Sequence, residues 1–220
     1  MAAYEIDISM SAQTVSELQN GGFALYAFKA VQAPIAGGAP LVWFMTQSLM
    51  TTTSVSWQDN FQAYVSTSEI IPNGMVSPSA TLPIGIGQTA QVDQNGNLTP
   101  SSSGPPSAIS ILNQGTNPWT AGVSQQVGGQ VNPVCALPLY GNMLDAITPL
   151  EKVLLMFATA TVNTGTVIYQ AYSPGLFVDL TGASQRSVTF DINQGWSWDG
   201  SPWAQPIGPG SDLIPLLITN

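Results

Sequence analysis

The sequence predicts an all-β protein, an antiparallel β-sandwich of two packed sheets with long irregular loops and at most one or two short helices. Short segments alternate polar and apolar residues, as a half-buried strand does. Twenty-one glycines and 17 prolines among the 220 residues divide these segments. Only residues 14–19 and 143–147 have the pattern of a short helix. Hydrophobic residues make up 44% of the chain, which is enough to build a core.

The length fits a single β-sandwich domain over residues 1–220. A weak internal repeat suggests two similar halves, about 1–105 and 106–220. Residues 42–45 resemble 153–156, and residues 61–64 resemble 169–172, in the same order and roughly 110 positions apart. An ancestral duplication and a chance likeness between apolar strands both explain this pattern, and the sequence leaves the choice open.

The first half of the chain begins with the clearest alternation. Tyr4, Ile6 and Ile8 alternate with polar neighbours, which predicts a half-buried strand. Asn95-Gly96 predicts a hairpin with a type I′ turn. Further strands are expected at residues 23–31, 41–45, 54–57, 61–67, 88–92 and 97–99.

The second half contains the strongest predicted strand, residues 151–161, which is apolar on both faces and is therefore expected at the centre of a sheet. Turn signals at 163–165, 173–175 and 181–184 follow it. They predict a four-strand meander formed by residues 151–161, 167–171, 176–180 and 187–192.

The charge of the chain excludes one class of partner and favours others. Three basic residues against twelve acidic ones give a net charge of −9, so we expect no nucleic acid partner. Charged residues are 7% of the chain, against about 25% in a typical protein. A surface of Ser, Thr, Asn and Gln suits a neutral glycan, further copies of the same chain, or the headgroup layer of a membrane.

The absence of histidine removes most catalytic and metal-binding arrangements. The single cysteine, Cys135, has apolar neighbours and no base beside it, so we expect a buried, inert thiol. Asp191 and Asp199 flank a tryptophan cluster as the carboxylates of a glycosidase would, but the Asp199-Gly200 turn favours Asp for backbone reasons alone. We expect no enzymatic activity, no metal and no cofactor.

The stretch of residues 195–203 contains four of the five predicted ligand-binding residues. It holds three of the six tryptophans. Trp196 and Trp198 are two positions apart, so their rings are expected on one face of an extended backbone. Aromatic rings stack on sugars, and polar neighbours can hold sugar hydroxyls. The predicted site is Trp196, Trp198, Trp203, Asp199 and Asn193, and the alternative is that these rings only pack against the core.

These features predict a non-catalytic binding protein, with lectin-like recognition of neutral glycans in a defence or recognition role. One alternative is a pore-forming or membrane-active, toxin-like protein, suggested by the same tryptophans and the Ser/Thr-rich residues 51–56. Another is a self-assembling structural protein, because low charge weakens repulsion between copies. The first residues lack the pattern of a signal peptide, so we expect a cytoplasmic protein or one released without a classical signal.

Overall fold

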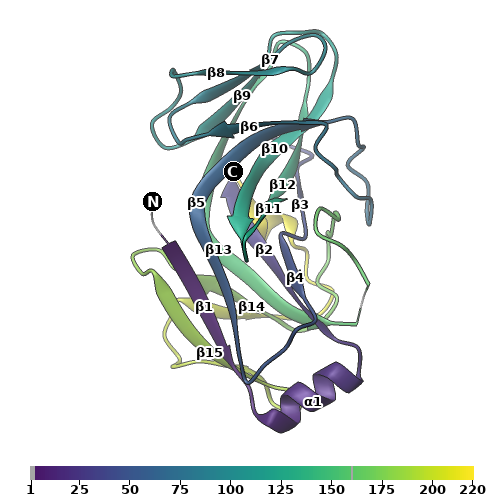
Figure 1. Cartoon of the computed structure of the whole chain (residues 1–220), viewed down its shortest axis with the longest axis vertical. Coiled ribbons are helices and arrows are strands. Elements are labelled where there is room, and N and C mark those ends of the chain that lie inside the picture. The colour runs from purple at the N-terminus through teal and green to yellow at the C-terminus, as the bar shows by residue number, and fades with distance from the viewer. Residues whose placement is uncertain (1–2, 160) are drawn as a thin grey trace.

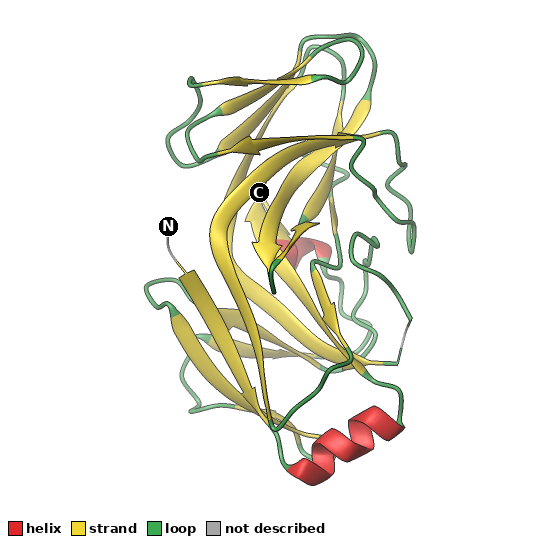
Figure 2. Cartoon of the chain, viewed as in Figure 1, coloured by secondary structure: helices red, strands yellow, loops and turns green. Residues whose placement is uncertain are grey.

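The computed structural model describes residues 3–159 and 161–220 as a sandwich of two packed sheets, with few helical turns (Figures 1 and 2). The prediction of an all-β sandwich is confirmed. The main core lies between the sheets, where Trp43 is fully buried and donates its indole N–H to the Gln125 carbonyl oxygen at 3.1 Å.

The first sheet has nine strands and carries both the start of the chain and the tryptophan stretch. Its strands run in the order β16 (Gly195–Ser197), β15 (Gln185–Asp191), β1 (Ala3–Ser9), β5 (Thr52–Ser66), β10 (Trp119–Val127), β12 (Cys135–Leu139) and β3 (Ala39–Pro40). Two more strands extend it, with β11 (Gln130–Pro133) beside β10 and β6 (Ala80–Ile84) beside β5.

The second sheet also has nine strands. Its order is β17 (Ala204–Ile207), β14 (Gly175–Asp179), β13 (Leu144–Ala158), β9 (Ile109–Asn113), β7 (Thr89–Val92) and β8 (Leu98–Ser101). Next to β13 lies β2 (Ala24–Gln32), which also pairs with β4 (Phe44–Thr46) and β18 (Ile218–Thr219). The helices are α1 (Ala12–Asn20) and α2 (Ile214–Leu217).

Both sheets are mixed, so the expectation of purely antiparallel sheets was wrong. Strands β1 and β15, β7 and β9, and β2 and β18 pair in parallel. Parallel neighbours need a crossover connection instead of a tight turn, and β1 meets β15 from the other end of the chain. Turn signals between adjacent segments therefore could not reveal these pairs.

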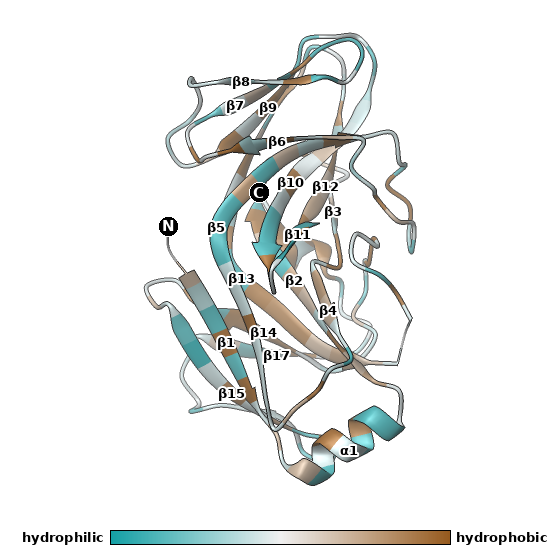
Figure 3. Cartoon of the chain, viewed as in Figure 1, coloured by the Kyte–Doolittle hydropathy of each residue, from teal (hydrophilic) through white to brown (hydrophobic). Residues whose placement is uncertain are grey.

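Two strands of 15 residues each, β5 and β13, run through both ends of the molecule (Figure 1). The first half of β5 pairs with β1, and its second half pairs with β6 and β10. Likewise β13 pairs first with β9 and then with β2 and β14. The last six residues of β13 are buried and almost wholly apolar, whereas β1 and β5 carry alternating polar and apolar bands (Figure 3).

Local predictions had mixed outcomes. The predicted helix at 14–19 is α1, which Ser11 caps by accepting a hydrogen bond from the Thr14 N–H at 3.0 Å. The predicted helix at 143–147 is wrong, because residues 144–147 begin β13 and pair with β9. The Asn95-Gly96 hairpin is confirmed between β7 and β8, but of these two residues only Gly96 has a positive φ, so the turn is not type I′.

The predicted meander is also wrong. Strand β13 pairs directly with β14, whereas the predicted strand between them, residues 167–171, forms only isolated bridges. Strand β15 lies in the opposite sheet, beside β1. The local alternation placed this strand correctly, yet the choice of sheet depended on a distant partner.

The tightest backbone approach in the first sheet is at Gly122, on β10. A Cβ atom there would lie 2.1 Å from the Cys135 carbonyl oxygen and 2.9 Å from the Tyr64 hydroxyl. Tyr64 is fully buried and donates a hydrogen bond to that same carbonyl at 2.6 Å. Neither group can move without breaking this bond.

We therefore expect Gly122→Ala to lower the free energy of unfolding by about 1–3 kcal/mol, as overpacked cores do. Urea unfolding followed by tryptophan fluorescence measures this loss. Gly208→Ala is the matched control, because its Cβ would meet nothing closer than 3.8 Å. Equal stability of the two variants would contradict the close approach.

Asp145 on β13 is a buried carboxyl without a partner. It is fully buried, and neither carboxylate oxygen has a hydrogen-bond partner among the described residues. Burial raises the pKa of this carboxyl to about 7. The folded protein therefore holds the proton more tightly than the unfolded chain does.

Because the folded pKa lies above the unfolded one, Asp145 should destabilise the fold progressively as the pH rises from about 4 to about 7. We expect the wild-type protein to unfold at a lower urea concentration at pH 8 than at pH 5. Asp145→Asn should remove most of this difference, whereas Glu69→Gln, at an exposed position, should keep it. An unchanged pH dependence in Asp145→Asn would refute the assignment.

Candidate ligand-binding site

The structure places the first predicted site residue, Trp196, over the end of the core. Its ring stacks on Phe157 with centroids 5.4 Å apart and lies 4.8 Å from the Phe190 ring. Its indole N–H donates to the Pro174 carbonyl oxygen at 3.3 Å. Trp196 therefore closes the sandwich with a half-buried ring.

Trp198 and Trp203 are half-buried as well, and local contacts hold both of them. The Trp198 indole N–H donates to the Ser201 carbonyl oxygen at 2.9 Å. The Arg186 guanidinium lies 4.9 Å from the centroid of the Trp203 ring, a cation–π contact. Each ring keeps part of its surface exposed.

The two polar members of the predicted site are exposed and shape turns. Asp199 accepts a hydrogen bond from the Ser201 N–H at 2.9 Å, and this bond, with weaker ones from the Ser201 and Trp203 side chains, lowers the pKa of its carboxyl. The Asn193 N–H donates to Asp191 at 2.9 Å. The structure thus links Asp199 with Trp203, whereas Trp196 turns to the core aromatics. That these five residues bind a ligand stays a prediction.

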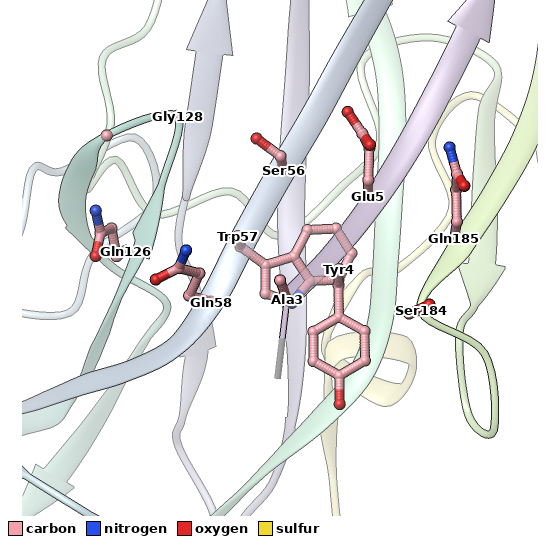
Figure 4. Close-up of a pocket in the computed structure, with 11 residues that line it drawn as sticks. Ala3, Tyr4, Glu5, Ser56, Trp57, Gln58, Gln126, Gly128, Ser184 and Gln185 are labelled. Carbon is pink, nitrogen blue, oxygen red and sulfur yellow. The ribbon is translucent and has the colours of Figure 1, made fainter. Parts of the chain in front are cut away.

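A cleft of about 340 Å³ lies elsewhere on the first sheet, beside Tyr4 (Figure 4). Four elements form it: the start of β1, the middle of β5, the tip of the β10–β11 hairpin, and the loop leading into β15. Its lining residues are Ala3, Tyr4, Glu5, Ser56, Trp57, Gln58, Gln126, Gly128, Gly129, Ser184 and Gln185.

The polar groups of this cleft are almost all neutral. Three glutamine amides and two serine hydroxyls line it, and Glu5 adds one carboxylate. In the register of the sheet, Glu5 lies opposite Ser56 on one side and Gln185 on the other. Within the described part of the chain, the side chains of Glu5, Ser56 and Ser184 form no hydrogen bond, so they are available to a ligand.

A second cleft of about 510 Å³ adjoins the first. The two share Ala3, Tyr4 and Ser184. Its remaining lining residues are Pro149, Leu150, Glu151, Leu180, Thr181, Gly182 and Ala183. Tyr4 therefore stands between a polar cleft and a more apolar one.

Stacked aromatic rings support Tyr4 from below. Its ring stacks on Trp57 at 5.5 Å with an interplanar angle of 18°, and Trp57 meets Trp43 edge-on at 5.6 Å. Burial, followed by the charges of Glu151 and Asp59, raises the pKa of the Tyr4 phenol, which therefore stays neutral. Tyr4 is a rigid, neutral and partly exposed ring.

Under these rings lies the buried Lys29 of β2. Its Nζ atom is 4.6 Å from the Trp57 ring centroid and 2.6 Å from Glu151 Oε2. The Trp57 indole N–H donates to the same oxygen at 3.2 Å. Burial lowers the pKa of Lys29, and the Glu151 carboxylate opposes this effect.

Only part of this site could be predicted from local sequence patterns. Tyr4 and Trp57 fall on the apolar faces of the strands predicted at 4–9 and 54–57. In the sheet, Tyr4 on β1 lies directly opposite Trp57 on β5. These two strands are far apart in the sequence, so no local pattern predicts that the residues meet. The position of Glu151 at this cleft depends on an irregularity in β13 between Pro149 and Val153, which no local pattern indicates.

Other site types find no support among the described residues. Cys135 is fully buried, as expected, and burial raises the pKa of its thiol to about 12. No group of three or more Cys, Asp or Glu side chains in the described ranges could hold a metal ion. None of the described helices has the length and apolar character needed to cross a membrane.

Comparisons with known proteins add no further constraint: no family model, no curated protein and no solved structure matches this chain.

Proposed function

We propose that this protein is a non-catalytic, lectin-like binder of neutral glycans, with its site in the cleft beside Tyr4. One observation carries the proposal. A rigid tyrosine ring stands at the side of a cleft whose polar lining consists of three amides, two hydroxyls and one carboxylate. This cleft does not include the tryptophan stretch. The proposed site therefore differs from the site that the sequence predicted at residues 195–203.

The chemistry of the cleft matches that of a sugar. A sugar ring has an apolar C–H face that packs on an aromatic ring and hydroxyls that both donate and accept hydrogen bonds. Glutamine amides and serine hydroxyls also donate and accept, so they can pair with such a ligand from several directions. A net charge of −9 disfavours phosphorylated or acidic glycans.

The carboxylates near the cleft support binding rather than hydrolysis. Glu151, in the adjoining cleft, is held by Lys29 and by the Trp57 indole. Glu5 is then the one carboxylate of the polar cleft that is available to a ligand. A glycosidase needs two carboxyl groups acting on the same bond.

We expect a neutral-glycan array to give hits with this protein. Tyr4→Ala, Gln126→Ala and Gln185→Ala should each weaken the best hit about tenfold, because each removes a stacking or hydrogen-bonding group. Trp198→Ala is the control and should retain wild-type affinity. Isothermal titration with the best glycan measures these changes. An array without hits, or affinity lost only in Trp198→Ala, would refute the proposed site.

A second candidate function is membrane binding. It rests on an exposed apolar patch, defined as Ile71, Met75 and Tyr172. These side chains are 50%, 56% and 40% exposed. Hydrogen bonds hold their loops together, from the Tyr172 hydroxyl to Asn73 at 2.8 Å and from the Asn73 N–H to the Val167 carbonyl oxygen at 2.9 Å. A tyrosine beside exposed aliphatic side chains suits the interface of a bilayer.

If the patch contacts membranes, the protein should release dye from neutral phosphatidylcholine vesicles. Ile71→Ser combined with Met75→Ser should reduce the release at least severalfold, because the double variant removes most of the apolar area. Tyr4→Ala is the control, since it changes the cleft and leaves the patch intact. No release by the wild-type protein would eliminate this function.

A further inference from the structure

The contact between Lys29 and Glu151 is closer and drier than that of an ordinary ion pair. The Lys29 side chain is 0% exposed, and its Nζ lies 2.6 Å from Glu151 Oε2. Three aromatic rings surround the amine, with centroids at 4.6 Å for Trp57, 5.8 Å for Tyr4 and 5.9 Å for Trp43. Desolvating such a pair costs more than its attraction returns in many proteins.

The sheet itself brings the two side chains together. Lys29 on β2 is the register partner of Val153 on β13, and the pairing shifts between Pro149 and Val153. Bulges of this kind re-aim a side chain, and here Glu151 is directed at the amine. The two residues are 122 positions apart in sequence but lie on neighbouring strands.

We propose that Lys29 and Glu151 condense into an intramolecular amide crosslink that joins β2 to β13. The lone pair of the neutral Nζ adds to Cδ of the protonated Glu151 carboxyl. The tetrahedral intermediate then loses a hydroxyl, which leaves as water with a proton from Nζ. One Nζ–Cδ bond forms and one Cδ–O bond breaks, so the step needs no oxidant, reductant or activated co-reactant.

Several features of the site favour this reaction. Burial lowers the pKa of the Lys29 amine, which favours the neutral form that acts as the nucleophile. The Trp57 N–H, 3.2 Å from Oε2, can stabilise the negative charge that develops on that oxygen. Fixed side chains in contact also reach effective concentrations of about 10⁵ M or more.

The surroundings also favour the product. The amide replaces a buried charge pair with a neutral group. The Glu151 side chain is 21% exposed and lines the cleft of about 510 Å³, so the released water has a path to solvent. Asp59, with a buried oxygen that lacks a partner among the described residues, adds a second carboxyl to the cluster.

The mass of the intact, denatured full-length protein tests the proposal directly. We expect a mass lower than that of the sequence by one water. After proteolysis, the fragment containing Lys29 should remain joined to the fragment containing Glu151. A protein that keeps its full sequence mass after prolonged incubation in the folded state would overturn the proposal.

Two variants locate the bond. Lys29→Arg keeps the positive charge but lacks the amine nucleophile, and Glu151→Ala lacks the carboxyl. Both should show the full mass of their sequences whether or not they fold. A loss of water that persists in either variant would place the crosslink elsewhere and overturn this assignment. The readout is independent of glycan binding, so either proposal can fail without the other.

Discussion

The centre of the sandwich depends on the hydrogen bonds that the Glu151 carboxylate accepts. This carboxylate accepts a hydrogen bond from Lys29 on its own sheet and another from Trp57 on the opposite sheet. Trp57 belongs to β5 and Glu151 to β13, the two long strands that serve both ends of the molecule. The Glu151 side chain thus connects β5 and β13, each of which pairs with different strands along its length.

This contact also determines the properties of the neighbouring surface. Lys29 holds Trp57 by a cation–π contact, Trp57 stacks under Tyr4, and Tyr4 forms the boundary between two clefts. The packed side chains of Lys29 and Trp57 therefore support the tyrosine ring from below. A fixed ring loses little conformational entropy when a ligand packs on it.

All three basic side chains of the protein contact another side chain of the fold. Lys29 pairs with Glu151, Lys152 pairs with Asp179 at 3.0 Å, and Arg186 covers the Trp203 ring. With these three cations already in contact, we expect little affinity for phosphate or carboxylate ligands. The groups that remain for ligand binding are amides, hydroxyls and aromatic rings, and they are the basis of the proposed glycan function.

The sequence by itself determined the all-β class and most strand positions, because the alternation of apolar residues and the turn residues act locally. Tyr4, Ile6 and Ile8 gave β1, and Asn95-Gly96 gave the β7–β8 hairpin. It also fixed the scarcity of charge and the absence of histidine chemistry. Only the tertiary structure decided that β15 pairs in parallel with β1, that residues 144–147 extend a strand, and that Tyr4 stacks on Trp57. The physical reason is distance along the chain: these contacts join segments whose local patterns fit many partners, and packing of the whole core selects one.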